Sequence, residues 1–359
     1  MPTLEASNIA DLVTSTLRDL GRLRFTQIAQ NLTNYEVMSR ILKKDKVQFD
    51  DGYGIQKTLM VDYSSSARNV GMFETDDVNV EDFLQTIDIP WRHTTANWAY
   101  EVREVLMNRG ASRIVDMIKT RRIATMIGLA ERMEADFFAA PGGSTDKTNP
   151  FGLPYWVVKY ASGSTTGGFY GGNHASYSSG PGGLNSNTYT NWRNYTCKYT
   201  NVAKSDLITK LRTAYRKIRF KSPVDIPDYR KGVGQQYRIY APLDEIIEME
   251  TLAENQNENL GRDLAAMDGT ITFRRNPIVW IETLDSDSDA PIYLLDWSKF
   301  YPVFLKGDYL RESPPKESPS QHNVYHCHLD LTWNILCTDR RAQACLSTGR
   351  TTNGSAALS

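Results

Sequence analysis

Two histidines and a cysteine occupy three consecutive positions in NVYHCHLDLTWNILC, residues 323–337. Imidazole nitrogen and thiolate sulfur are zinc ligands, so His326, Cys327 and His328 could in principle hold a metal ion. The residues around them alternate between polar and apolar, which is typical of a half-buried β-strand. On such a strand Cys327 points into the apolar layer and the two histidines point away from it. The three side chains therefore cannot share one ion.

A smaller metal site could form on the polar face of this strand. His326 and His328 would supply two ligands and Asp330 a third, as in a metal-dependent hydrolase. His-x-His patterns arise freely on polar strand faces, however, and no other Cys/His cluster supports this interpretation. The chain also lacks GxxxxGK[ST], HExxH, GxSxG and a GxGxxG after a strand. We therefore expect no catalytic, cofactor-binding or metal residues, and a protein that is not an enzyme.

Composition limits the classes of protein to which this chain can belong. The chain has 359 residues, 40% of them hydrophobic and 23% charged, which is typical of two or three packed globular units. Its 41 Lys and Arg nearly balance its 42 Asp and Glu, so we expect no overall attraction to nucleic acid or membrane. No apolar run reaches the roughly 18–20 residues that span a bilayer, and the N-terminus lacks a secretory signal pattern. We expect the thiols of the four cysteines to be reduced and mostly buried, and the protein to be made in a cytoplasm. The cysteines are Cys197, Cys327, Cys337 and Cys345.

The first half of the chain predicts extended elements. Residues 1–45 predict two short amphipathic helices that need a surface to dock on. Strand-like runs at 55–63 and 83–91 surround a polar middle and predict a long hairpin. Apolar residues at helical spacing then predict one helix over 111–140, roughly 40–45 Å long, which would serve as a spine.

The second half predicts a mixed unit followed by strands. Residues 161–191 carry no charged side chain and are rich in Gly, Ser, Tyr and Asn. This composition favours a flexible loop unless another surface orders it, and neighbouring chains are one candidate. Ser205 is the predicted cap of an amphipathic helix with a basic outer face. A further helix is expected at 243–253, and strands dominate from residue 270 onward.

Charge is unevenly distributed between the hairpin and this basic helix. The hairpin segment 46–99 is acidic, whereas 204–238 has an excess of positive charge. Complementary charge suggests that the hairpin of one chain lies on another chain. The basic helix could instead face an inner wall and meet phosphate. The candidate contact residues are Asp50, Asp51, Lys57, Asp62, Arg68, Glu74, Asp76, Asp77, Arg212, Arg216, Lys217 and Arg219.

Several long stretches resemble a known family. They are WRHTTANWAYEVREVLMNRGASRIVDMIKTRR, NPFGLPYW, YRIYAPLDEIIEMETLAENQNENLGRDLAAMDGTITFRRNPIVW, DWSKFYPVFLKGDYLRES and QHNVYHCHLDLTWNILCTDRRAQ. Together with the order of the elements, they are similar to major capsid proteins of tailed bacteriophages. The resemblance covers about residues 20–347. It implies an α+β chain with the Hong Kong ninety-seven-type capsid fold.

The resemblance also implies a division of the chain. Its parts are an N-terminal arm (1–45), an extended E-loop (46–99), a peripheral (P) domain (100–150, with the spine helix), an axial (A) domain (151–264, with the loop 161–191), further P-domain strands (265–347, returning through the A domain at 293–310) and a C-terminal tail (348–359). In this family the E-loop overlies the P domain of a neighbour. A domains meet at the centres of hexamers and pentamers.

The function implied is that of a coat protein that self-assembles into the icosahedral head of a tailed phage. The implied partners are further copies of the chain, a portal protein, decoration proteins and double-stranded DNA bound without sequence preference, with no membrane. Only about 45 residues precede the hairpin, so a separate scaffolding protein, or none, is expected. The protein would be made in the bacterial cytoplasm and reside in the virion. The nearest alternative is an encapsulin shell, which shares the fold and encloses enzymes.

Overall fold

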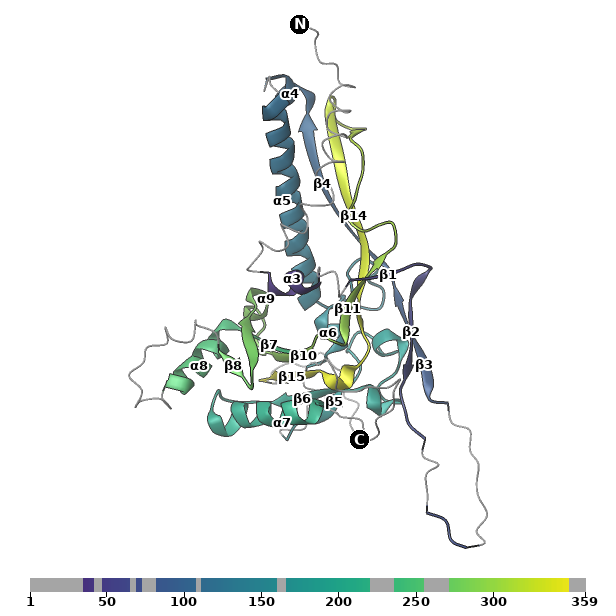
Figure 1. The fold of residues 1–359 in the computed structure, drawn as a ribbon, viewed down its shortest axis with the longest axis vertical. Helices are drawn as coiled ribbons and strands as arrows, with labels where there is room; N and C mark the ends of the chain where they lie inside the picture. The colour runs from purple at the N-terminus through teal and green to yellow at the C-terminus, as the bar shows by residue number, and fades with distance from the viewer. Residues whose placement is uncertain are drawn as a thin grey trace.

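The computed structural model describes residues 35–41, 47–64, 69–72, 82–107, 111–159, 166–219, 236–254 and 271–348. These residues form two sheets, one long helix and a hairpin that pairs with neither sheet (Figure 1). Within the described residues, no helix is both long enough and apolar enough to cross a membrane.

A six-stranded sheet is built around one long strand, β14 (Val324–Cys337). β4 runs antiparallel to it over ten pairs, from Glu101 opposite Val324 to Arg92 opposite Trp333. β11, β12 and β13 also pair antiparallel with β14, and β1 pairs parallel with β11. The other strands of this sheet are β1 (Gln48–Asp50), β4 (Arg92–Glu101), β11 (Phe300–Leu305), β12 (Arg311–Glu312) and β13 (Lys316–Glu317).

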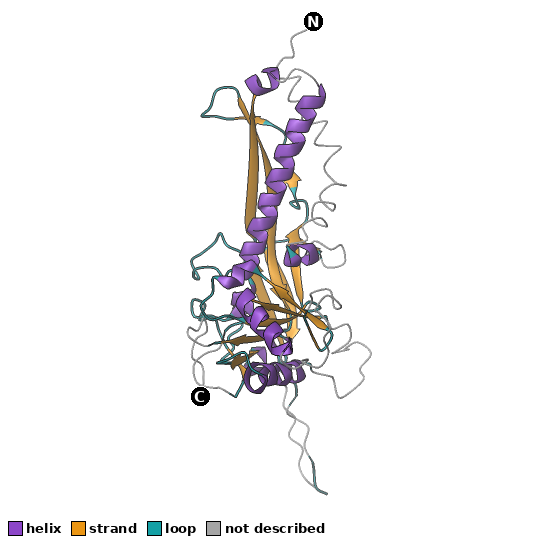
Figure 2. Ribbon diagram, turned by 90° about the vertical axis from the view of Figure 1, so that its left-hand side faces the viewer, coloured by secondary structure: helices purple, strands orange, loops and turns teal. Residues whose placement is uncertain are grey.

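The helix α5 (Ala111–Phe138) lies lengthwise against β4 and β14 (Figures 1 and 2). Its 28 residues give a length of about 42 Å, and it ends two residues before the end predicted for the spine helix. Its buried residues include Ile118, Met126, Leu129, Met133 and Phe137. They pack with the apolar face of β14, so the helix and the two long strands stabilise one another.

One polar residue lies within the apolar stripe of α5. Arg122 is 3% exposed, and its Nε lies 2.5 Å from the Oε1 of Glu312 on β12. Burial raises the pKa of Glu312, and the nearby guanidinium opposes that shift. A buried charge needs such a partner, so this ion pair fixes β12 against the helix.

A seven-stranded sheet forms the other end of the body. Its order is β5-β6-β15-β10-β7-β9-β8. The chain crosses between the sheets repeatedly: β10 belongs to this sheet, β11 and β14 to the six-stranded one, and β15 returns. Its strands are β5 (Gly168–Gly171), β6 (Asn194–Lys198), β7 (Tyr237–Ala241), β8 (Thr272–Phe273), β9 (Asn276–Trp280), β10 (Ile292–Asp296) and β15 (Ala344–Ser347).

Two helices cover one face of this sheet, α7 (Thr209–Ile218) and α8 (Leu243–Glu254). α7 continues a π-helical turn, Lys204–Ile208, which begins without a side-chain cap. The predicted capping role of Ser205 is therefore wrong. Asp206 satisfies the preceding backbone instead, because its carboxylate accepts hydrogen bonds from the N–H groups of Thr200 (2.7 Å) and Asn201 (3.0 Å).

The hairpin consists of β2 (Gly54–Met60) and β3 (Leu84–Pro90). It forms a two-stranded sheet of its own that lies along one side of the body (Figure 1). The remaining short elements are α3 (Glu36–Ile41), α4 (Val102–Met107), α6 (Leu153–Trp156), α9 (Glu282–Asp285) and the 3-10 turns Pro181–Gly183, Thr190–Trp192 and Arg340–Ala342.

A buried arginine organises the uncharged loop. Arg340 is 0% exposed, and burial lowers its pKa to about 10, which leaves it charged at neutral pH. Its guanidinium donates to backbone carbonyls of Trp156, Gly172 and Trp192 at 2.6–2.8 Å. It also donates to Ser186 Oγ at 2.9 Å. The described part of the loop is therefore ordered by its own chain.

Candidate subunit-contact surfaces

The hairpin β2–β3 carries an apolar surface that the described residues leave open. Met60 and Leu84 are direct cross-strand partners, and each side chain is 59% exposed. A two-stranded hairpin is marginally stable alone in water, and gathered exposed apolar side chains mark interaction sites. Other exposed apolar side chains of this segment are Tyr53, Tyr63, Val70 and Met72. The hairpin is thus suited to lie on another surface.

The base of the hairpin is fixed to the body of the same chain. Ile87 is fully buried and lies against Gly182, whose φ is +68°; a Cβ on this glycine would come within 2.9 Å of Ile87 Cγ2. The amide of Asn191 donates to the carboxylate of Asp62 at 3.2 Å. The turns after residue 180 therefore set the direction in which the hairpin leaves the body.

The predicted charged residues of the hairpin are exposed or partly exposed where the structure describes them. Asp50 ends β1, Asp51 lies in the following turn, Lys57 lies on β2 and Asp62 follows it. Four more predicted contact residues lie outside the described residues: Arg68, Glu74, Asp76 and Asp77.

The basic residues predicted for α7 do gather on an exposed face. Arg212, Arg216, Lys217 and Arg219 are exposed, whereas Leu211, Ala214 and Ile218 on the opposite face are buried. Lys210 differs, because it pairs with Asp206 one turn earlier. No ion pair among the described residues joins the exposed face to the acids of the hairpin. Within one chain, then, the described members of the two predicted charge groups are not paired with one another.

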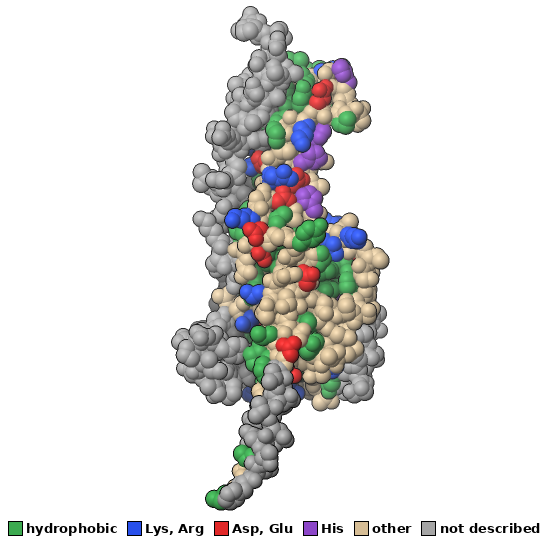
Figure 3. Space-filling model, turned by 90° about the vertical axis from the view of Figure 1, so that its right-hand side faces the viewer, with side chains coloured by type: hydrophobic (Ala, Val, Ile, Leu, Met, Phe, Trp, Pro, Cys, Tyr) green, Lys and Arg blue, Asp and Glu red, His purple; other side chains and the backbone are tan. Residues whose placement is uncertain are grey.

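Histidines line the outward face of β4 and β14, as Figure 3 shows. The rings of His326 and His328 lie 4.9 Å apart between centroids, and both side chains are partly exposed. Cys327 between them is 1% exposed and packs toward α5. Burial raises the pKa of this thiol to about 12, so it stays protonated. The predicted separation of the cysteine from the histidines is confirmed.

A third histidine forms a hydrogen-bonded cluster further along this face. His93 Nδ1 lies 2.9 Å from Thr332 Oγ1, and Nε2 lies 3.7 Å from Asp330 Oδ1. The Thr332 hydroxyl donates its hydrogen bond to Asp308. It therefore does not donate to His93, as a nucleophilic hydroxyl would donate to its general base. Arg311 donates to both carboxylates, at 2.8 and 3.2 Å. The cluster therefore connects neighbouring strands and does not activate a nucleophile.

The alternative hypothesis for the histidines of β14 is that they bind a metal ion. Among the described residues, no three His, Cys, Asp or Glu side chains are grouped so that they could hold a metal ion. His326, His328 and Asp330 do not converge there. The metal-dependent hydrolase thus has no ligand set within the described part of the chain. All four cysteines are buried, and none forms a disulfide within the described residues.

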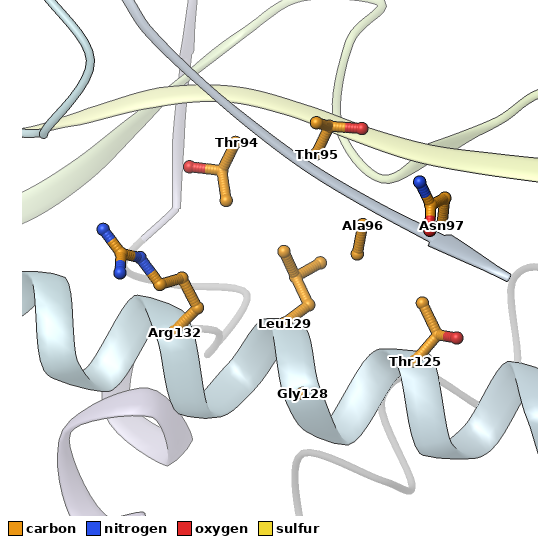
Figure 4. Close-up of a pocket in the computed structure, with 8 residues that line it drawn as sticks. All are labelled: Thr94, Thr95, Ala96, Asn97, Thr125, Gly128, Leu129 and Arg132. Carbon is orange, nitrogen blue, oxygen red and sulfur yellow. The ribbon is translucent and has the colours of Figure 1, made fainter.

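A shallow groove of about 240 Å³ lies between β4 and α5 (Figure 4). Leu129 points from the helix toward the strand, and Gly128 leaves the helix surface open beside it. Arg132, the charged residue of the lining, is held by Asp136 at 3.0 Å and Asn149 at 3.1 Å. The lining has no carboxylate, histidine or cysteine, so the groove offers space and hydrogen bonds but no acid–base chemistry. It is lined by Thr94, Thr95, Ala96, Asn97, Thr125, Gly128, Leu129 and Arg132.

Solved shell proteins resemble this chain over most of its length. The capsid of cyanophage A-1(L) matches with a TM-score of 0.56 and 14% sequence identity, covering 86% of this chain and 91% of that chain. The capsid of an empty GTA particle matches with a TM-score of 0.52 and 13% identity, covering 85% and 88%. The SrpI encapsulin of Synechococcus elongatus matches with a TM-score of 0.47 and 10% identity, covering 89% of each chain. No protein-family model and no curated protein matches the sequence.

These similarities show the fold. The long helix beside a long-stranded sheet, the second sheet and the separate hairpin form the α+β arrangement of tailed-phage capsid subunits. The predicted Hong Kong ninety-seven-type fold is confirmed.

Proposed function

We propose that this chain is the major capsid protein of a tailed double-stranded DNA bacteriophage. Copies of it would form hexamers and pentamers that close into an icosahedral head around the genome. The observation that carries this proposal is the capsid fold, which extends over 86% of the chain. The exposed apolar hairpin supports it, because an isolated subunit would leave this surface in water.

Assembly itself would be the activity. Residues 46–99 act as an E-loop, whose hairpin β2–β3 overlies the P domain of a neighbour. That P domain is formed by α5 with the six-stranded sheet, to which β1 and β4 of the same segment contribute. The A domain, formed around the seven-stranded sheet, meets its copies at capsomer centres. Each subunit touches several neighbours, so weak contacts act together and no single contact needs to be strong.

The proposal includes partners and a location. A separate scaffolding protein, a portal and decoration proteins would join the shell, and packaged DNA would lie on its inner face. The chain would be made in the host cytoplasm and retained in the virion. Its role in the particle is structural and not enzymatic.

Expression of the full chain followed by electron microscopy tests the proposal. We expect shells or capsomers from the natural chain. Met60→Asp combined with Leu84→Asp should prevent them, because about 1.5–3 kcal/mol per buried apolar side chain would be lost at each contact. Ser320→Asp with Gln321→Asp adds the same charge at exposed positions of the β13–β14 turn and is the matched control.

A monomer at high concentration, with or without the hairpin substitutions, would refute the assembly proposal. Shells that contain DNA and carry a tail at one vertex in infected cells support a phage head. Shells filled with an enzyme would instead identify a protein compartment.

A further inference from the structure

Two consecutive arginines occupy a turn whose backbone disfavours them. Phe273 and Asn276 face each other at the end of the β8–β9 hairpin, so Arg274 and Arg275 are its two turn residues. Their φ angles are +50° and +69°. Asn-Gly adopts such a type I′ turn with less strain. Long cationic side chains at strained positions point to a role beyond forming the turn.

Two guanidinium groups from different parts of the chain lie over the ring of one buried tyrosine. The Cζ of Arg274 lies 5.4 Å from the ring centroid of Tyr215 on α7, and the Cζ of Arg219 lies 5.2 Å from the same centroid. Arg219 also donates to the tyrosine hydroxyl at 3.1 Å. Phe273 holds the ring edge-on at 6.3 Å between centroids. The ring therefore fixes two like charges near one another.

These charges have no counter-ion in the described chain. No Asp or Glu among the described residues forms an ion pair with Arg219, Arg274 or Arg275, and all three are exposed. The ring quadrupole attracts each cation but does not neutralise it. Guanidinium groups that are held in place, exposed and without an acidic partner among the described residues are suited to bind an anion.

α7 extends this site into a row. Arg212 and Arg216 are four residues apart and share one face of the helix, and Arg219 directly follows the last residue of α7, so the three positions span about 10 Å. Cations in a last helical turn are favoured by the helix dipole, which accounts for Arg216. The dipole does not account for Arg212, near the start of α7, or for the arginines of the β8–β9 turn.

We infer that Arg212, Arg216, Arg219, Arg274 and Arg275, here called the arginine row, bind backbone phosphates of double-stranded DNA. The inference rests on the proposed function, which places DNA inside the shell. Planar guanidinium groups bind phosphate oxygens in bidentate fashion. A DNA strand presents a phosphate about every 3.4 Å along its axis, so the row on α7 can meet more than one.

The shape of the site favours a duplex over a single strand. Single-stranded nucleic acid is held by stacking bases on exposed aromatic rings. Here Tyr215 is 8% exposed and Tyr237 beside it 6%, so neither offers a free face. The arginine row thus binds the backbone without reading bases, and its affinity depends strongly on salt.

Substitution of the turn tests the inference without disturbing the fold. Arg274→Asn with Arg275→Gly removes two charges and gives the type I′ turn its preferred residues. Lys306→Gln with Lys316→Gln removes the same charge from exposed positions near and on the six-stranded sheet and is the control. The probe is a fluorescent DNA duplex of mixed sequence, titrated with each purified full chain over a series of salt concentrations.

The turn variant should bind the duplex about tenfold more weakly or worse at low salt. The slope of log K against log salt should fall by about 0.9 for each lost phosphate contact, or about 1.8 in total. The control should keep its slope and stay within about twofold of the natural chain, because a distant charge is screened. Equal losses in both variants, or no loss in the turn variant, would overturn the inference.

Electron microscopy of the same variants separates this site from the assembly proposal. Shells from the turn variant, together with weakened duplex binding, support the arginine row. Failure of the turn variant to assemble, with duplex affinity unchanged, would assign the row to a second copy of the chain and overturn the inference. If the natural chain makes no shells and the turn variant binds the duplex more weakly than the natural chain, the result would support the DNA site and refute the capsid function.

Discussion

Glu134, on the long helix α5, accepts a hydrogen bond of 3.0 Å from the backbone N–H of Met38 on α3. The carboxylate is 6% exposed, and Tyr35 donates to the neighbouring Glu131 at 2.6 Å. Burial raises the pKa of Glu134 to about 7, although hydrogen bonds from the α3 backbone oppose the rise. The attachment of α3 to the spine helix therefore depends on a carboxyl group that titrates near neutral pH.

We expect this attachment to be stronger in mild acid. The pKa of Glu134 is higher in the folded chain than its ordinary value of 4.5, so folding favours the protonated form. The resulting stabilisation is complete below about pH 4.5 and is lost as the pH rises through about 7. Its size is on the order of 3 kcal/mol. Urea unfolding of the purified chain at pH 5.5 and pH 8 measures the difference.

Glu134→Gln should remove most of this pH dependence, because the amide cannot ionise. Glu317→Gln is the matched control, since Glu317 is an exposed carboxylate on β13 and takes no part in this attachment. If the natural chain and Glu134→Gln respond equally to pH, the carboxyl group does not govern the attachment of α3.

Arg340 should be intolerant even of lysine. Lysine keeps the charge but concentrates its donors at one point, whereas the guanidinium reaches carbonyls in several directions. Buried carbonyls left without a donor cost about 1–3 kcal/mol each. We therefore expect Arg340→Lys to lower the free energy of unfolding by about 3 kcal/mol or more, as measured by urea denaturation.

The neighbouring residue provides the control for that substitution. Arg341 is exposed and stacks on Phe169 at 4.7 Å. Arg341→Lys should change the free energy of unfolding by less than about 1 kcal/mol. A similar loss from both substitutions would mean that the buried hydrogen bonds are not what orders the loop.

The elements with a clear period were predictable from the sequence. Alternation around His326 and Cys327 predicted the inner and outer faces of β14, because a strand that borders one apolar layer must alternate. The alternation ends beyond Leu331, where both faces become buried. Asn334 is fully buried, and its amide group binds backbone atoms of Phe151 and Pro90. Local pattern does not reveal such long-range hydrogen bonds.

The polar residues that matter most inside the fold gave little signal in the sequence. Arg340 stands beside Arg341 in DRRAQ, and only tertiary structure makes one buried and the other exposed. Glu134 lies in a helix with ordinary spacing. Arg274 and Arg275 gave no turn signal, because their turn is of the type that Asn-Gly usually forms. Long-range packing decides the burial and the contacts of these side chains, and the spacing of residues along the sequence does not reveal it.

The direction of the hairpin should depend on Gly182. Alanine at its positive φ is disfavoured by about 1 kcal/mol, and the added methyl group would also meet the buried Ile87 at 2.9 Å. Gly183 has a φ of +82° but no atom within 4 Å of a built Cβ. Gly183→Ala therefore carries the backbone penalty alone. We expect Gly182→Ala to destabilise the chain by a further 1–3 kcal/mol, roughly the cost of overpacking a core. It should also reduce the yield of shells below that of Gly183→Ala, because Ile87 must shift and turn the hairpin away from its neighbour. Equal stability and equal shell yield from the two variants would show that this contact does not set the direction of the hairpin.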